Sequence, residues 1–147
     1  CAAPEIPIDV GFKTHYLGRL DDETLAKVYA AADVMVVPSR YEAFGQTASE
    51  ALACGTPVVA FDVTGLKDIV DRQQNGYLAQ PYDSEDLARG IAWVLEDPQR
   101  HQKLCENARI KVEQKFTLEV QAIEYKNLYE EVWQAAKLGL PMANHSR

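Results

Sequence analysis

The stretch YEAFGQTASEALACGTPVVAF, residues Tyr41–Phe61, predicts a loop, a helix, a turn and a strand in that order. The helix is expected from about Gly45 to Cys54, because Gly55 occupies the usual C-terminal glycine position and Pro57 follows two residues later. The apolar run Pro57–Phe61 is typical of a strand that is buried on both faces. This stretch decides how the rest of the chain can fold.

A second apolar run, Asp33–Pro38, precedes the helix and also predicts a buried strand. Strand, helix and strand then form a right-handed βαβ unit of a parallel sheet. Ligands of open α/β sheets bind beyond the carboxyl ends of the strands. The loops Pro38–Gly45 and Asp62–Gly65 both leave such ends, so they are expected to line one crevice.

Two glutamates flank the start of the predicted helix. Glu42 precedes it, and Glu50 lies more than one turn inside it, with Phe44 and Gly45 between them. The first amides of a helix have no partner within the helix and attract anions. An exposed Glu50 carboxylate can reach a ligand docked on those amides. The pattern therefore predicts a site for a phosphorylated molecule that is rich in hydroxyl groups.

The remaining elements alternate along the chain, and one α/β domain over residues 1–137 with a loose tail over 138–147 is expected. Acidic caps and helical spacing of apolar residues mark the helices. The further expected elements are an extended segment at Thr14–Leu17, a helix at Asp21–Ala32, a helical segment at Leu66–Asp71, a strand at Tyr77–Ala79, a helix from Asp83 to Asp97, and helices at Gln99–Lys115 and Leu118–Ala136.

Composition excludes several classes of protein. The net charge of −7 and the lack of any Lys or Arg run argue against nucleic acid as a partner. No segment is long and apolar enough for an integral membrane span. The three cysteines have no metal-ligand spacing, which favours reduced thiols in a cytoplasmic protein. A dinucleotide-binding domain is disfavoured because no G-x-G-x-x-G appears.

Three segments resemble the group 1 retaining glycosyltransferases: Tyr41–Gly45, Glu50–Val59 and Asn75–Leu78. The resemblance extends from Tyr16 to about Trp133. These enzymes have two Rossmann-like domains with the active site between them, and this chain is similar to most of the C-terminal domain, which holds a nucleotide-diphosphate sugar. The fold class implied is a partial Rossmann-like parallel sheet flanked by helices. The implied function is hexosyl transfer to a glycan, a lipid or a small acceptor.

The resemblance also implies site residues. Glu42 matches a catalytic-site glutamate that contacts the donor sugar hydroxyls, and Glu50 matches one that binds the ribose hydroxyls. The other donor-binding candidates lie at the start of the helix, where backbone amides face the sugar and diphosphate: Phe44, Gly45, Gln46 and Thr47. Further candidates for the crevice are Ser39, Arg40 and Gly65, for which a plain surface role is the alternative. No cofactor and no metal site are expected.

The family's domain normally begins with two more strand–helix units, which carry an Arg and a Lys that clamp the diphosphate. Their absence here predicts an N-terminally truncated domain that is inactive without a missing N-terminal acceptor domain or another chain. The strand at Thr14–Leu17 is then expected to shift inward, to exchange with another copy in a homo-oligomer, or to pair with a separate chain.

Two readings of the function remain open. The first is the donor-binding part of a glycosyltransferase in glycan biosynthesis, cytoplasmic or peripheral to a membrane. The second is a non-catalytic binding or assembly module derived from such a domain. The sequence specifies neither the base, nor the donor sugar, nor the acceptor.

Overall fold

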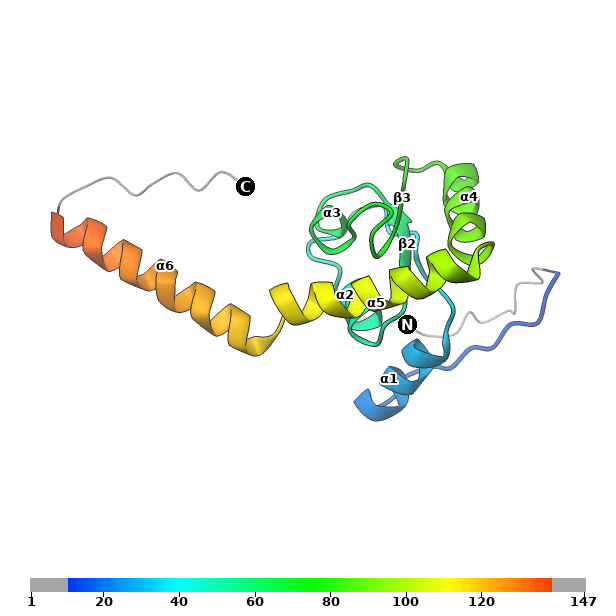
Figure 1. Ribbon diagram of the computed structural model, residues 1–147, viewed down its shortest axis with the longest axis horizontal. Coiled ribbons are helices and arrows are strands. Elements are labelled where there is room, and N and C mark those ends of the chain that lie inside the picture. Colours follow the sequence, from blue (N-terminus) through cyan, green and yellow to red (C-terminus); the bar gives the residue numbers. More distant parts are fainter. Residues whose placement is uncertain (1–10, 139–147) are drawn as a thin grey trace.

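The computed structural model describes residues 11–138, which form a parallel β-sheet packed among helices (Figure 1). The elements follow in the order α1 (Asp22–Ala31), β1 (Met35–Val37), α2 (Gln46–Ala53), β2 (Val58–Phe61), α3 (Leu66–Ile69), β3 (Gly76–Ala79), α4 (Ser84–Leu95), α5 (Pro98–Lys115) and α6 (Leu118–Leu138). Strands that alternate with helices confirm the α/β class and the partial Rossmann-like sheet.

The sheet has the order β1-β2-β3, and both pairs of neighbours are parallel. All four residues of β2 are buried, as their uninterrupted apolar sequence predicts for a central strand. Met35 pairs with Val58, and Val58 pairs in turn with Gly76. The three strands therefore end at one edge, so the loops that follow them lie close together.

The core lies between the sheet and the helices that cover it. Its fully buried members include Leu52 of α2, Val59 of β2 and Leu104 of α5. The helix α2 packs on α5, and α4 packs on β2 and β3. The loop that precedes α2 is therefore attached to a well-packed helix.

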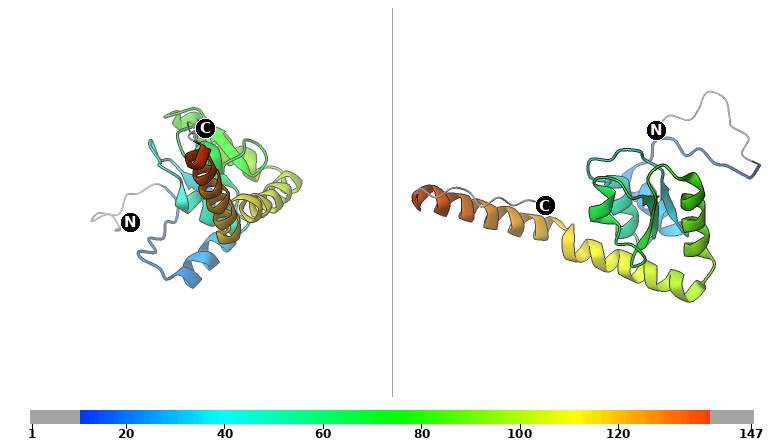
Figure 2. Two further views of the ribbon diagram at one scale, coloured as in Figure 1. Left: turned by 90° about the vertical axis from the view of Figure 1, so that its left-hand side faces the viewer. Right: turned by 90° about the horizontal axis from the view of Figure 1, so that it is seen from above.

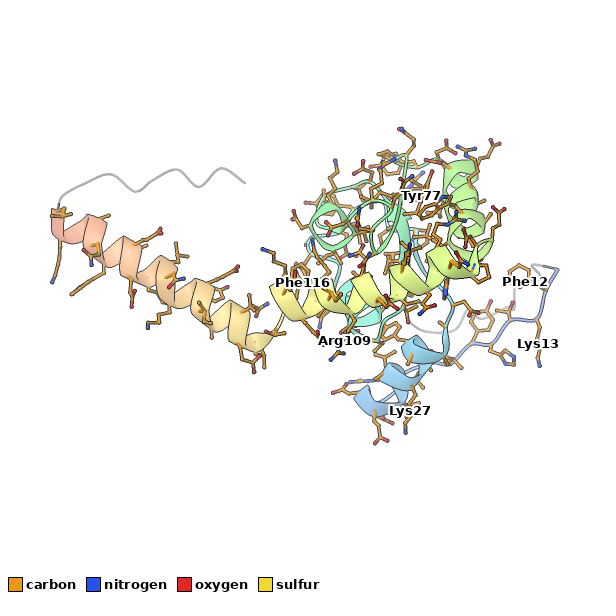
Figure 3. All side chains as sticks on the ribbon, in the orientation of Figure 1. Phe12, Lys13, Lys27, Tyr77, Arg109 and Phe116 are labelled. Carbon is orange, nitrogen blue, oxygen red and sulfur yellow. The ribbon has the colours of Figure 1, made fainter. Side chains whose placement is uncertain are left out.

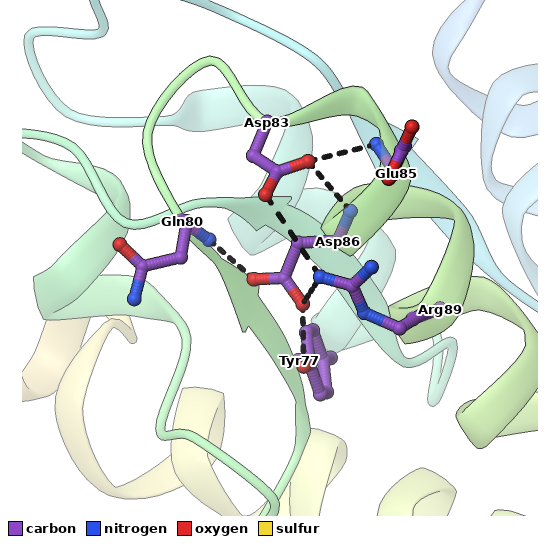
Figure 4. A network of polar contacts seen from close by, with 6 residues as sticks. All are labelled: Tyr77, Gln80, Asp83, Glu85, Asp86 and Arg89. Carbon is purple, nitrogen blue, oxygen red and sulfur yellow. Dashed lines mark hydrogen bonds and ion pairs between the residues drawn. The ribbon is translucent and has the colours of Figure 1, made fainter.

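Tight polar contacts hold the start of α4 (Figure 4). The Asp83 side chain caps the helix by accepting hydrogen bonds from the backbone N–H of Glu85 and of Asp86, each at 2.9 Å. The buried Asp86 carboxylate accepts from the Gln80 N–H at 2.7 Å and from the Tyr77 hydroxyl at 2.9 Å. These bonds attach the loop after β3 to α4.

Asp97 and Pro98 both end α4 and begin α5. The sequence predicts that this pair ends α4, and in the structure Asp97 also caps α5, with Pro98 in its first turn. Proline suits that position because the first amides of a helix have no partner within the helix.

The helix α6 projects away from the body (Figures 1 and 2). A break in the helix at Phe116 and Thr117 separates it from α5. Phe116 is labelled at this junction in Figure 3. None of the residues of α6 is buried, and Tyr129 and Trp133 are more than half exposed. Among the described residues, no helix has the length and apolar character needed to cross a bilayer.

Two expectations about the ends of the domain need correction. Residues 14–17 form no strand, and Tyr16 and Leu17 are 48% and 53% exposed, so the inward shift into the sheet is wrong. Without a neighbouring strand, their backbone gains no ladder hydrogen bonds. Leu138 belongs to α6 and not to a tail. Residues 1–10 and 139–147, with the rest of the expected tail, lie outside the described residues.

Candidate functional site

The loop from β1 to α2 ends at Gly45, which occupies the N-cap position of α2 in a left-handed conformation with φ of 97°. A Cβ at this position would lie 3.0 Å from the Leu66 side chain and 3.6 Å from that of Ile69. Both the backbone conformation and the close approach therefore require glycine. The buried side chains of Leu66 and Ile69 form the floor beneath the start of α2.

The N-terminus of α2 has no side-chain cap. Gly45 offers no side-chain hydrogen bond, and the first turn contains no acidic residue. Within the part of the chain that the structure describes, no acceptor faces the backbone N–H groups of Gln46, Thr47 and Ala48. Gln46 and Thr47 are exposed. Unpaired amides at an exposed helix start favour an anion at this place.

Glu42 is half-buried and lies beside Gly45, since a Cβ at Gly45 would be 3.7 Å from the Glu42 Cγ. Its backbone is tied to the loop after β2: the Glu42 N–H donates to the Thr64 hydroxyl at 3.1 Å, and that hydroxyl donates to the Glu42 carbonyl. No described residue hydrogen-bonds or pairs with the Glu42 carboxylate. The backbone of Glu42 is therefore fixed, and its carboxylate remains available to a ligand.

Glu50 lies on the side of α2 that faces α1. Its Oε2 accepts a hydrogen bond from the Tyr29 hydroxyl at 3.3 Å, and it is half-buried where an exposed carboxylate was expected. Burial raises the pKa of Tyr29 above its usual value, and the Glu50 charge adds to this effect. The Tyr29 carbonyl in turn accepts from the Thr56 hydroxyl at 2.6 Å. One oxygen of Glu50 is therefore occupied, and the other has no partner among the described residues.

The Phe44 side chain turns toward the break between α5 and α6. Its ring meets the Phe116 ring edge to face, with centroids 5.8 Å apart. It borders a groove of about 780 Å³ whose other lining residues come from the end of α5 and from α6: Lys115, Phe116, Gln121, Glu124, Tyr125, Asn127, Leu128 and Glu131. Phe44 thus contributes its backbone to the start of α2 and its ring to this groove.

The three crevice candidates differ in their surroundings. Ser39 is half-buried, and Arg40 is exposed with its guanidinium 5.3 Å from the centre of the Tyr82 ring. The Tyr82 hydroxyl also donates to the Arg40 carbonyl at 3.3 Å. Gly65 is packed so tightly that a Cβ would lie 2.5 Å from the Ala43 carbonyl oxygen. The structure therefore brings the loops after β1 and β2 together, as expected from their strand ends.

Sequence reasoning missed Thr64 and Tyr82, which hold the loop after β1 from two sides. Both adopt positive φ, 30° and 66°, a region where residues other than glycine are uncommon. Neither has a sequence signal for this conformation, because Thr and Tyr ordinarily avoid it. The described residues contain no group of three or more His, Cys, Asp or Glu side chains that could hold a metal ion.

Comparison with known proteins defines the family. Residues 9–111 match the model of the glycosyl transferases group 1. An uncharacterized glycosyltransferase of Methanocaldococcus jannaschii is 38% identical over 123 residues, which are 84% of this chain and 32% of that protein. The chain belongs to the group 1 glycosyl transferase family, and it spans between about a fifth and a third of the length of the curated relatives that it matches.

Solved structures agree with this assignment. Sucrose-phosphate synthase from Thermosynechococcus elongatus is 42% identical with a TM-score of 0.74, over 82% of this chain and 30% of that chain. HepE of Anabaena in complex with UDP-glucose is 30% identical with a TM-score of 0.64, over 72% and 30%. The C-terminal domain of the group 1 protein LpcC from Francisella tularensis is 28% identical with a TM-score of 0.62, over 69% and 53%. The similarity to an isolated C-terminal domain agrees with the predicted part of the family fold.

Proposed function

We propose that this chain is the donor-binding part of a retaining glycosyltransferase and that it holds a nucleotide-diphosphate sugar at the start of α2. The observation that carries this proposal is the uncapped N-terminus of α2 between two glutamates, one with a fully unpartnered carboxylate and one with a free oxygen. The similarity to HepE, which was solved with UDP-glucose, supports the ligand class.

Each group at the site has a distinct role in this proposal. The amides of Gln46 and Thr47 bind the diphosphate, and the helix dipole adds to the attraction. The Glu42 carboxylate accepts hydrogen bonds from the sugar hydroxyls. The free oxygen of Glu50 accepts from the ribose hydroxyls. A carboxylate suits both tasks because it accepts several charge-assisted hydrogen bonds.

Transfer to an acceptor belongs to a longer protein in this proposal. The relatives are about three to five times as long as the matched region, and the residues described here form only the donor side. The acceptor side comes from an N-terminal domain or another chain. The purified 147-residue chain is therefore expected to bind a nucleotide sugar weakly and to release no sugar from it.

The test is thermal-shift and ligand-observed NMR titration of the chain with UDP, ADP and GDP and with their glucose derivatives. A ligand that binds only the folded form raises the melting temperature. We expect one nucleotide series to bind, and Glu50→Gln to weaken binding of both the nucleotide and its sugar about tenfold, a loss of about 1.4 kcal/mol. Glu96→Gln is the matched control, because Glu96 is an exposed glutamate at the C-terminal end of a different helix, α4.

The proposal fails if no nucleotide or nucleotide sugar binds to the folded chain. It also fails if Glu50→Gln and Glu96→Gln have the same effect on affinity. Turnover of a nucleotide sugar by the chain alone would contradict the assignment of transfer to a longer protein.

A further inference from the structure

The Thr64 hydroxyl contacts both peptide groups of Glu42. It accepts a hydrogen bond from the Glu42 N–H at 3.1 Å and donates one to the Glu42 carbonyl oxygen. The Gly65 N–H donates to the same carbonyl at 3.0 Å. Because the N–H and the C=O of a residue lie on the two sides of its Cα, bonds to both fix the direction in which its side chain leaves the backbone.

Thr64 holds this place in an unfavourable conformation. Its φ of 30° lies in the left-handed region, which is particularly costly for a β-branched residue. Glycine would adopt this conformation without strain. The presence of Thr therefore needs a reason other than the shape of the turn.

Burial does not supply that reason. Thr64 is exposed, so neither its hydroxyl nor its methyl group is needed to fill the core. Water can satisfy exposed polar groups, and the net gain from such hydrogen bonds is small. What the hydroxyl does specifically is to hold Glu42, whose carboxylate has no partner among the described residues.

We infer that Thr64 is a positioning residue, which directs the Glu42 carboxylate toward the sugar moiety of the bound nucleotide sugar. The inference rests on the proposed function, because it assigns Glu42 to the sugar and Glu50 to the ribose. Thr64 therefore determines how strongly the site prefers the nucleotide sugar over the free nucleotide. It does not touch the ligand, and it has no effect on the phosphate contacts at the start of α2.

The test compares the affinities of the 147-residue chain for UDP-glucose and for UDP. If the preceding titration selects another base, the corresponding nucleotide sugar and nucleotide are used. Thr64→Val keeps the shape and removes the hydroxyl. We expect it to lower the affinity for the nucleotide sugar about tenfold, or about 1.4 kcal/mol, and to leave the affinity for the nucleotide within about twofold. Thr64→Ser keeps the hydroxyl, so its affinity for the nucleotide sugar is expected to stay within about threefold of that of the unmodified chain.

Thr64→Gly separates positioning from stability. It removes the hydroxyl and also the strain, so we expect a melting temperature at or above that of the unmodified chain, together with the same loss of preference for the nucleotide sugar. A residue that served only to stabilise the turn would behave differently, since its loss would lower the melting temperature and affect both ligands alike.

Hydrogen exchange of the Glu42 amide gives a readout that needs no ligand. Thr64→Val and Thr64→Gly should accelerate this exchange, and Thr64→Ser should keep it slow. Glu42→Gln serves as the reference for the binding data, because it should reproduce the loss of sugar preference with the Glu42 backbone still held.

The outcomes distinguish this inference from the proposed function. If the unmodified chain binds no nucleotide or nucleotide sugar, the proposed function fails and this inference fails with it. If the unmodified chain prefers the nucleotide sugar and Thr64→Val keeps that preference, only the role of Thr64 is wrong. Equal losses for nucleotide and nucleotide sugar in Thr64→Val would also overturn it.

Discussion

The starts of α2 and α4 solve the same physical problem in opposite ways. Each helix follows a loop that leaves a strand end, and each begins with amides that lack partners within the helix. At α4, Asp83 caps these amides and acidic residues occupy the first turn. At α2, Gly45 provides no cap and no acidic residue follows. The chain satisfies its own donors at α4 and leaves them available at α2.

This difference separates stability from binding. The α4 start uses carboxylates from within the chain, so it strengthens the fold and has little to offer an anion. The α2 start relies on its neighbours in the core for stability, because Leu66 and Ile69 pack directly beneath Gly45. Substitutions at the two starts should therefore change different measured quantities.

The largest expected effect comes from removing the buried carboxylate at the α4 start. Asp86→Ala leaves the Gln80 N–H and the Tyr77 hydroxyl without their acceptor. We expect the free energy of unfolding to fall by about 2–4 kcal/mol, measured by urea denaturation. The control is Asp83→Ala, which removes only a helix cap and should cost about 1 kcal/mol.

Nucleotide affinity at temperatures where the Asp86→Ala chain is folded should stay unchanged. A loss of nucleotide affinity equal to that of Glu50→Gln would show that the two helix starts do not act independently. It would remove the basis of the comparison.

The stability of the fold at acidic pH should also depend on the Asp86 carboxylate. The hydrogen bond from the Gln80 N–H lowers the pKa of Asp86 below its usual 3.8, and the Tyr77 hydroxyl and Arg89 add to the shift. A group with a lowered pKa in the folded state stabilises the fold fully above its unfolded pKa, and this contribution disappears as the pH falls through the folded pKa. Stability should therefore decrease as the pH falls below about 4.

Urea unfolding from about pH 6 to about pH 3 measures this loss. Asp86→Asn cannot titrate at this position, so its stability should depend less on pH over that interval. The same dependence in both proteins would mean that other carboxylates dominate the acid response.

The smallest expected effect comes from giving α2 a feature of α4. Gln46→Glu places a negative charge in the first turn at nearly constant shape, and it should stabilise the fold by about 0.3–1 kcal/mol. The same charge repels a diphosphate and should weaken nucleotide binding by about 1 kcal/mol, or about fivefold. Thermal denaturation and NMR titration measure the two changes. Gln46→Lys should change both in the opposite direction.

The sequence predicts most of the framework because the physical signals are local. The apolar run that becomes β2 is buried at every position, and Asp21 caps α1 as its place before an amphipathic helix indicates. The chain order of strands and helices then implies a parallel sheet. The prediction of an extended strand at Thr14–Leu17 was wrong because a strand also needs a neighbouring strand to pair with. The short sequence pattern of this segment gives no information about such a neighbour.

The site could be predicted only in outline. Gly45 and the two glutamates are recognisable from their positions relative to one helix, and the structure places Glu42 and Gly45 at its start and Glu50 in its second turn. Whether they bind a nucleotide sugar remains a prediction. The contact between Tyr29 and Glu50 joins residues 21 apart, and that between Thr64 and Glu42 joins residues 22 apart. Such contacts depend on how loops meet in space, so no local pattern reveals them.

Leu66 and Ile69 give the site an unusual constraint. The same side chains belong to the hydrophobic core and support Gly45, so no other layer of side chains separates the core from the start of α2. A change in their size would alter the shape of the proposed anion site and the stability of the domain together. New ligand preferences are therefore more readily acquired at exposed positions on the rim, such as Arg40 and Gln46, than through the floor.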